Sequence, residues 1–256
     1  MGNRREYIIK GIVDICSKLD QKGFVANHDG NVTAKFEDGF LATPTAEAKA
    51  AITPEMILDL DKEGKKTGGI GKPFSELNLH LAAYNEREEA RAVVHAHPPF
   101  ATARGLVGKP LEISLPEAVV SIGHIIPVAD YSMPGSVAND RVVCEALRQS
   151  DVFMIAGNGV LSIGKNLEEA YLRLELLEHV AKIDFYAASM GPVMTLPEAD
   201  LQKLLEKRAK LGLGPKASNH VTKNILENYD QEKDNIQFGQ LQDIIAKEVN
   251  RYLENS

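Results

Sequence analysis

The chain has 256 residues, of which 44% are hydrophobic and 25% are charged, and its formal net charge is −7. These values are typical of a soluble globular protein, and the negative charge gives no electrostatic reason to expect nucleic acid or an anionic membrane as a partner. The charge makes small ligands or proteins the expected partners. Cys16 and Cys144 form no CxxC motif, and no apolar run approaches the roughly 20 residues of a membrane span, so we expect a cytoplasmic protein.

Predicted elements follow one another along most of the chain. Apolar residues recur at helical spacing in 5–21, 75–86, 99–106, 139–147 and 167–190. Short apolar, strand-like runs occupy 31–36, 39–43, 56–61, 91–97, 117–123, 125–131, 151–157 and 158–164. This order predicts an α/β domain in which helices cover a central sheet.

The last part of the chain differs in composition. Residues 213–236 are polar, which predicts a linker after a domain that spans 1–212. Residues 237–256 repeat apolar side chains at helical spacing, which predicts a C-terminal amphipathic helix. A short helix of this kind is marginal alone in water, so we expect it to pack on a partner surface.

Two histidines end the strand-like run in "RAVVHAHPPFATARG". Side chains alternate along a strand, so His95 and His97 point to the same face, and Pro98 stops the strand directly after them. Two imidazoles on one face can converge on one ion, which favours a metal site. The alternative is a strand that simply ends in polar residues at the surface.

Five segments in order, "GNVTAKFEDGFLATPT", "GKPFSELNLHLA", "RAVVHAHPPFATA", "PVADYSMPGS" and "GNGVLSIGKNLEEA", resemble the class II aldolase/adducin family, typified by fuculose-phosphate and ribulose-phosphate enzymes. The resemblance covers about 5–212. It implies a three-layer α/β/α domain with a central, mostly antiparallel sheet, and a homotetramer.

The resemblance also implies roles for individual residues. His95 and His97 match the family's ligands to a zinc ion, which stabilises an enediolate, and Glu76 matches its base. Tyr131 matches the family's acid, which acts from a neighbouring subunit. The implied activity is a metal-dependent aldehyde-lyase that cleaves a ketose phosphate, or a related hydroxy-ketone, to a three-carbon ketone and an aldehyde. From the residues alone, the alternative explanation of Glu76 is a glutamate that the helix macrodipole favours, and that of Tyr131 is an ordinary loop aromatic.

Three loops match the family's phosphate-binding segments. The matching residues are Gly30, Asn31, Thr33, Thr43, Thr45 and Ser75. Hydroxyls and free amides suit phosphate oxygens, but Ala46 and Phe74 replace a glycine and a serine of the family pattern. Turn residues that make local hydrogen bonds are the alternative explanation.

Asn158 stands where the family has its third zinc ligand, a histidine. An amide oxygen is a poor zinc ligand, so three outcomes are open: a harder cation such as Mn²⁺ held with Glu76, substitution by His124, or loss of the metal. Asn158 also favours a decarboxylase of a hydroxylated acid on the same fold. A sugar-phosphate epimerase and a non-enzymatic, adducin-like structural domain are further alternatives.

The C-terminal helix resembles the targeting helices of enzymes packaged in bacterial microcompartments, which bind shell protein. This resemblance implies a shell-protein partner and a microcompartment as the location. Docking on the protein's own oligomer is the leading expectation for this helix, and shell binding is the alternative.

Overall fold

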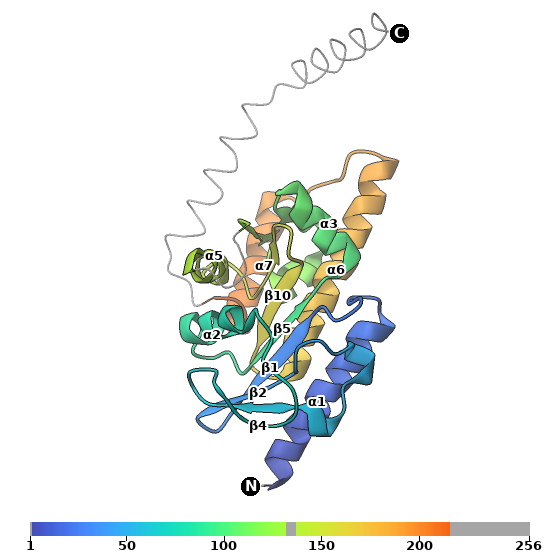
Figure 1. Cartoon of the computed structure of the whole chain (residues 1–256). Helices are drawn as coiled ribbons and strands as arrows, with labels where there is room; N and C mark the ends of the chain where they lie inside the picture. The colour runs from blue at the N-terminus through green and yellow to red at the C-terminus, as the bar shows by residue number, and fades with distance from the viewer. Residues whose placement is uncertain (1, 132–136, 216–256) are drawn as a thin grey trace, which may run out of the picture. The chain divides into compact units, whose positions relative to one another are not determined.

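The structure is a computed structural model, and it describes residues 2–131 and 137–215. These residues belong to one compact unit, Met1–Pro215 (Figure 1). The predicted linker and C-terminal helix lie outside the described residues, apart from 213–215.

An eight-stranded sheet forms the centre of the unit, in the order β4-β3-β2-β1-β5-β10-β9-β8. The strands are β1 (Asn31–Phe36), β2 (Gly39–Ala42), β3 (Leu58–Leu60), β4 (Lys66–Gly68), β5 (Ala92–Ala96), β8 (Val128–Ala129), β9 (Val152–Ile155) and β10 (Val160–Gly164). Neighbouring strands run antiparallel except for the parallel pair β8 and β9. The prediction of a mostly antiparallel sheet is therefore confirmed. A separate two-stranded sheet joins β6 (Leu111–Glu112) to β7 (Ile125–Ile126).

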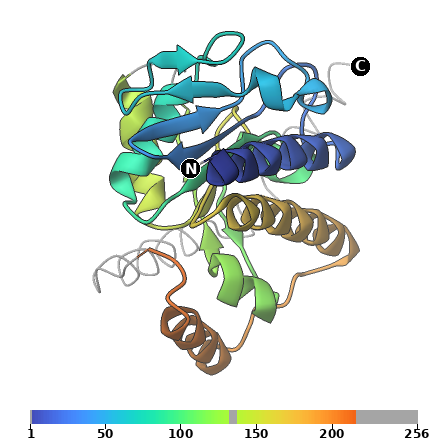
Figure 2. The same ribbon diagram turned by 90° about the horizontal axis from the view of Figure 1, so that it is seen from below.

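Helices cover both faces of this sheet. They are α1 (Gly2–Gln21), α2 (Leu77–Glu86), α3 (Pro99–Val107), α4 (Pro116–Ile122), α5 (Val137–Leu147), α6 (Leu167–Met190) and α7 (Glu198–Lys210), with short 3₁₀ turns at Lys49–Ala51 and Pro54–Met56. α1 and α6 lie side by side on one face, and α2 packs with α5 on the other (Figure 2). The three-layer α/β/α prediction is confirmed.

Alternation along β5 divides its side chains between two cores. Ala92, Val94 and Ala96 belong to the core under α1 and α6, whereas Val93 belongs to the core under α2 and α5. His95 lies two residues after Val93 and so faces α2. β5 therefore places the His95 side chain on the face of the sheet that α2, the helix after Glu76, covers.

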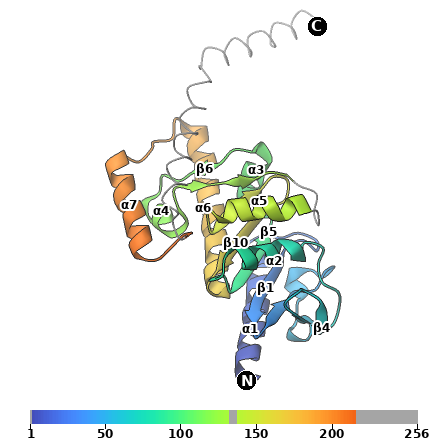
Figure 3. The ribbon, with the colours of Figure 1, turned by 90° about the vertical axis from the view of Figure 1, so that its left-hand side faces the viewer.

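Two helices differ from the prediction. The run 117–123, expected as strand-like, is the helix α4, which Pro116 begins; its buried Ala118, Val119 and Ile122 follow helical spacing. A run this short does not distinguish a strand from a buried helix by its apolar content. α7 was not predicted, and it packs on α4 at the side of the unit (Figure 3). None of the helices among the described residues combines the length and apolar character that a membrane span requires.

Candidate active site

The strand ends around His95 bring together residues that are distant in sequence. β5 lies between β1 and β10, and in this register His95 is opposite Asn31 on one side and Leu161 on the other. Because both neighbours run antiparallel to β5, its end meets their beginnings. Glu76 is the residue directly before α2, and Asn158 precedes β10 by two residues. All four polar side chains therefore gather at one edge of the sheet.

The Glu76 carboxylate is the centre of this cluster. Its Oε1 accepts a hydrogen bond of 2.5 Å from the amide of Asn158, and its Oε2 accepts one of 3.4 Å from the amide of Asn31. Nε2 of His95 lies 3.4 Å from Oε2. Burial alone would raise the pKa of Glu76, but the positive charge that His95 carries when it is protonated at Nε2 and the two amide hydrogen bonds outweigh burial and hold that pKa well below its usual value. Glu76 is therefore ionised at neutral pH.

Each histidine has its Nδ1 atom directed at an oxygen that only accepts hydrogen bonds. Nδ1 of His95 lies 3.0 Å from the carbonyl oxygen of Val160, and Nδ1 of His97 lies 2.9 Å from Oδ2 of Asp29. Both Nδ1 atoms must therefore carry the hydrogen, which leaves the Nε2 lone pair of each neutral ring free. Both Nε2 atoms are buried, and among the described residues neither has a hydrogen-bond partner. The rings lie 5.2 Å apart, measured between centroids.

This donor set fits a divalent cation. A bare imidazole nitrogen that faces an ionised carboxylate needs a positive charge, either a proton or a metal ion, to satisfy both groups. The 3.4 Å separation of His95 Nε2 and Glu76 Oε2 matches the roughly 3.4 Å between two ligands of a tetrahedral ion with bonds of about 2.0–2.1 Å. His97 supplies a second unpaired nitrogen at the same edge.

The third metal-ligand position, where the family pattern has a histidine, is occupied by Asn158 in this chain. Within 2–131 and 137–215, no group of three His, Cys, Asp or Glu side chains qualifies by itself as a metal site. Asn158 lies at the cluster, but its amide donates to Glu76. His124, the predicted substitute, lies at the two-stranded sheet, where Nδ1 donates to the carbonyl of Ile113 and Nε2 lies 3.7 Å from Glu112. The structure therefore does not bring His124 to the cluster.

Two of the predicted phosphate-binding hydroxyls are buried and already engaged. Thr33 Oγ1 lies 2.8 Å from Nδ1 of His80 and 2.8 Å from the hydroxyl of Tyr84, and Thr43 Oγ1 accepts a hydrogen bond from the amide of Val32. Both threonines are completely buried. In this arrangement neither hydroxyl is available to a ligand.

The other predicted phosphate-binding residues have different surroundings. Thr45 and Ser75 are exposed, whereas Gly30 and Asn31 are buried beside His95. Gly30 has a φ of +73°, and a Cβ atom there would lie 3.1 Å from the carbonyl oxygen of His95. Ala46 adopts a φ of 61°, the left-handed conformation that suits the glycine of the family pattern.

Tyr131 lies beside the loop that carries Asn158. Its ring is 3.6 Å from the position that a Cβ atom on Gly157 would take, and the side chain is 63% exposed. The segment that follows, 132–136, lies outside the described residues. Gly159, on the other side of Asn158, has a φ of +72° and packs so closely on the His97 ring that any Cβ atom would collide with it.

Sequence reasoning missed two residues of the cluster, Asp29 and His80. His80 is four residues after Glu76 on α2, so helical spacing could have indicated it. Its Nε2 is buried without a hydrogen-bond partner among the described residues, and burial, together with the charge that His95 carries when protonated, lowers the pKa of His80 to about 3. Asp29 is in a loop, and no periodic pattern marks it.

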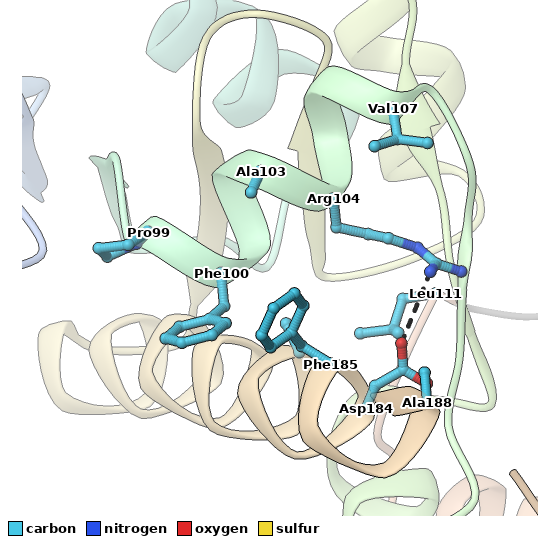
Figure 4. A pocket seen from close by; sticks show the side chains of 10 residues that line it. Pro99, Phe100, Ala103, Arg104, Val107, Leu111, Asp184, Phe185 and Ala188 are labelled. Atoms are coloured by element: carbon cyan, nitrogen blue, oxygen red, sulfur yellow. Dashed lines mark ion pairs between the residues drawn. The ribbon is translucent and has the colours of Figure 1, made fainter. Parts of the chain in front are cut away.

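An apolar cavity of about 440 Å³ lies elsewhere, between α3 and α6 (Figure 4). Phe100 and Phe185 line it, and Arg104 forms an ion pair of 3.5 Å with Asp184 at its rim. Its lining contains none of the predicted site residues. This cavity therefore brings together none of the residues predicted for acid–base chemistry or ligand binding.

Comparison with known proteins shows the family of this chain. The sequence signature of the class II aldolase and adducin N-terminal domain matches residues 10–185. The chain belongs to this family. It is 32% identical over 183 residues to the L-fuculose phosphate aldolase of Methanococcus maripaludis strain C5, with 72% of this chain and 98% of the relative covered. It is 29% identical over 210 residues to the L-fuculose phosphate aldolase of Escherichia coli K12, with 82% and 97% covered.

Solved structures of the family share the fold. A structure of L-fuculose 1-phosphate aldolase matches with a TM-score of 0.73 and 25% identity, covering 78% of this chain and 95% of that one. YgbL of Escherichia coli, described as a candidate aldolase, epimerase or decarboxylase, matches with a TM-score of 0.72 and 25% identity, covering 78% and 98%.

Proposed function

We propose that this protein is a metal-dependent class II aldolase that cleaves a ketose phosphate, or a related hydroxy-ketone, to a three-carbon ketone and an aldehyde. The observation that carries the proposal is the pair of buried, unpaired Nε2 atoms of His95 and His97 at the strand edge where His95 faces the ionised Glu76. The names of the relatives, which are L-fuculose phosphate aldolases, support the same reaction class.

His95, His97 and Glu76 are the residues that would hold the cation, which we propose to be Zn²⁺ or, with fewer nitrogen ligands, Mn²⁺ or another divalent ion. Such an ion supplies Lewis-acid polarisation of the substrate's carbonyl and hydroxyl oxygens.

The protein's own residues supply the proton transfers. Glu76 is ionised and so can accept a proton from the substrate, and the amides of Asn158 and Asn31 hold its carboxylate in place. Tyr131 is largely exposed, and it has the hydroxyl that can return a proton to the leaving atom. In this role Asn158 orients the base.

A metal analysis of the purified protein, followed by an aldehyde-release assay, tests the proposal. Protein never exposed to chelator and supplied with zinc and manganese should carry close to one divalent ion per chain, and at least one ketose phosphate or hydroxy-ketone should release an aldehyde. The Glu76→Gln variant should lose that release. Protein that binds no transition metal under these conditions would contradict the proposal.

A decarboxylase acting on a hydroxylated acid is the second candidate function. The engaged hydroxyls of Thr33 and Thr43 favour it, because a phosphate would find fewer donors, and YgbL is described with the same reaction class. Carbon dioxide release from hydroxy acids without aldehyde release would identify it. Isomerisation of a sugar phosphate would identify an epimerase, and a metal-free protein inactive in every assay would fit an adducin-like structural domain.

We also propose a homotetramer in which Tyr131 acts at a neighbouring subunit's site. Its 63% exposure in the single chain supports this. Mixing the inactive Glu76→Gln and Tyr131→Phe variants should restore partial activity through hybrid sites. No recovery after verified subunit exchange would place both residues in one subunit's site.

For the C-terminal segment, we propose a linker over 213–236 and a helix over 237–256 that docks on the protein's own oligomer, with binding to a microcompartment shell protein as the alternative. Removal of 236–256 separates these roles. A targeting helix predicts an active enzyme of unchanged thermal stability that no longer co-purifies with its partner, whereas self-docking predicts a loss of stability or of the oligomer.

A further inference from the structure

Asp29 uses both of its carboxylate oxygens at the edge of the candidate site. Oδ2 accepts the 2.9 Å hydrogen bond from Nδ1 of His97, and Oδ1 accepts a 2.6 Å hydrogen bond from the amide of Ala26. The first bond joins residues that are 68 positions apart, and the second fixes the carboxylate within its own loop. The direction of the carboxylate toward His97 is therefore set by the loop.

The loop that carries Asp29 is held to the rest of the site by main-chain contacts. The amide of His97 donates to the carbonyl of Phe24, and the amide of Asp29 donates to the carbonyl of Ala26, so the turn has a backbone hydrogen bond of its own. The buried Lys49 donates to the carbonyls of His28 and Glu47, which joins this loop to the next. The Asp29 side chain is thus not the only element that maintains the turn.

A carboxylate at Nδ1 decides which nitrogen of His97 is available. Because a carboxylate only accepts, Nδ1 carries the hydrogen, and the buried Nε2 keeps its lone pair. Carboxylates that hold a metal-binding histidine in this way fix the tautomer and make the ring a better ligand.

We propose that Asp29 is a positioning residue that fixes His97 in the tautomer whose Nε2 can bind a divalent cation. This inference rests on the proposed metal-dependent function. It assigns a role to a residue of the loop before β1 that the resemblance to the family did not indicate.

Two substitutions separate this role from a purely structural one. In Asp29→Asn, the amide oxygen can still accept from Ala26, but the amide nitrogen then faces Nδ1 of His97 with a hydrogen. The ring must respond by moving its own hydrogen to Nε2, which blocks the lone pair. Asp29→Ala removes both contacts, so the neutral His97 ring can carry its hydrogen on either Nδ1 or Nε2. A structural role therefore predicts that Asp29→Asn is the milder change, whereas the proposed role predicts that it is at least as severe.

The experiment measures zinc affinity on metal-free protein, by competition with a chromophoric chelator at pH 7.5. Asp29→Ala should weaken zinc binding about 10- to 100-fold, the range found when such partners of metal ligands are removed. Asp29→Asn should weaken it at least as much. Asp38→Asn removes the same unit of charge from the exposed turn between β1 and β2 and should change the affinity less than about twofold, because exposed charges are screened.

The tautomer itself has a spectroscopic signature that needs no substitution. In metal-free wild-type protein labelled with ¹⁵N at histidine, the His97 ring, assigned with a His97→Gln variant, should show hydrogen on Nδ1, and Asp29→Asn should move it to Nε2. Hydrogen on Nε2 in the wild type would overturn the inference, as would wild-type zinc affinity in Asp29→Asn. A wild-type protein that binds no divalent cation would instead overturn the proposed function, while the ring spectrum would still report the tautomer.

Discussion

A buried carboxylate far from the candidate site offers the sharpest test of what holds this fold together. Asp151, directly before β9, is 1% exposed and faces three arginines. Its Oδ1 lies 2.6 Å from Arg87, and its Oδ2 lies 3.2 Å from both Arg173 and Arg208. Replacing Asp151 with Asn keeps the shape of the side chain and removes the charge that these guanidinium groups share.

Each arginine also joins a different segment to this point. Arg87 donates to the carbonyl of Leu147 at the end of α5, Arg173 donates to the carbonyl of Ile163 in β10, and Arg208 of α7 donates to carbonyls of α4. Loss of the central carboxylate therefore weakens contacts between several elements at once.

The magnitude follows from the charges that remain. Arg87 keeps Glu89 at 2.7 Å, and Arg173 keeps Glu169 at 2.9 Å. Arg208 has no second carboxylate partner among the ion pairs of the described residues, so it becomes a buried charge that only the carbonyl oxygens of α4 contact. Removing one partner of a buried ion pair costs about 3–5 kcal/mol. For a domain of this size, that loss lowers the melting temperature by roughly 10 °C.

The assay is thermal and urea unfolding at one protein concentration, with wild type, Asp151→Asn, Arg208→Met and the double variant. The double variant should be more stable than the sum of the single losses predicts, because removing Arg208 also removes the unpaired charge. Asp200→Asn is the matched control: its 2.9 Å ion pair with Lys203 is exposed, so its loss should cost less than about 1 kcal/mol. A loss below 1 kcal/mol for Asp151→Asn, or strict additivity with Arg208→Met, would refute the reasoning.

Other substitutions test the site and its loops. Ala46→Gly should raise the free energy of unfolding by about 0.5–1 kcal/mol. Glycine removes the strain of the left-handed backbone at this position, where φ is 61°, and this gain exceeds the cost of glycine's greater freedom in the unfolded chain. A lower melting temperature would contradict this. Asn158→His should tighten zinc binding to the metal-free protein about tenfold or more, since an imidazole replaces an amide; unchanged affinity would mean that another residue fills the third position. The pKa of His80 is about 3 in the folded protein, below its unfolded value, so the unfolded chain takes up the extra proton and stability falls as pH drops from about 6.5 toward 3. Between pH 7 and 5 this amounts to about 2 kcal/mol, which His80→Gln should abolish in unfolding measurements; an unchanged pH slope in that variant would show that His80 is not responsible.

Local sequence patterns predicted the elements whose periodicity is strong. The long apolar helix was expected from Leu167 to about Met190, and α6 has these bounds. Alternation along 91–97 predicted His95 and His97 on one face, and the two rings lie 5.2 Å apart. These features follow from side-chain direction along a strand and around a helix, which the neighbouring residues alone determine.

The elements that were missed depend on distant partners. α7 is mostly polar, and its buried residues are Leu201 and Arg208, the second of which binds Asp151 from 57 positions away. α4 was mistaken because a short apolar run fits either a strand or a buried helix until its packing partners are known.

The sequence by itself determined which residue types are available for chemistry: two histidines, a carboxylate and a tyrosine in a recognisable order. Only the tertiary structure decided how they are used. It brought Asn158 to Glu76 across 82 positions and Asp29 to His97 across 68. Hydrogen-bond partners fix tautomers and carboxylate orientation, and such partners come from whichever strands and loops the sheet makes neighbours, so no local pattern contains them.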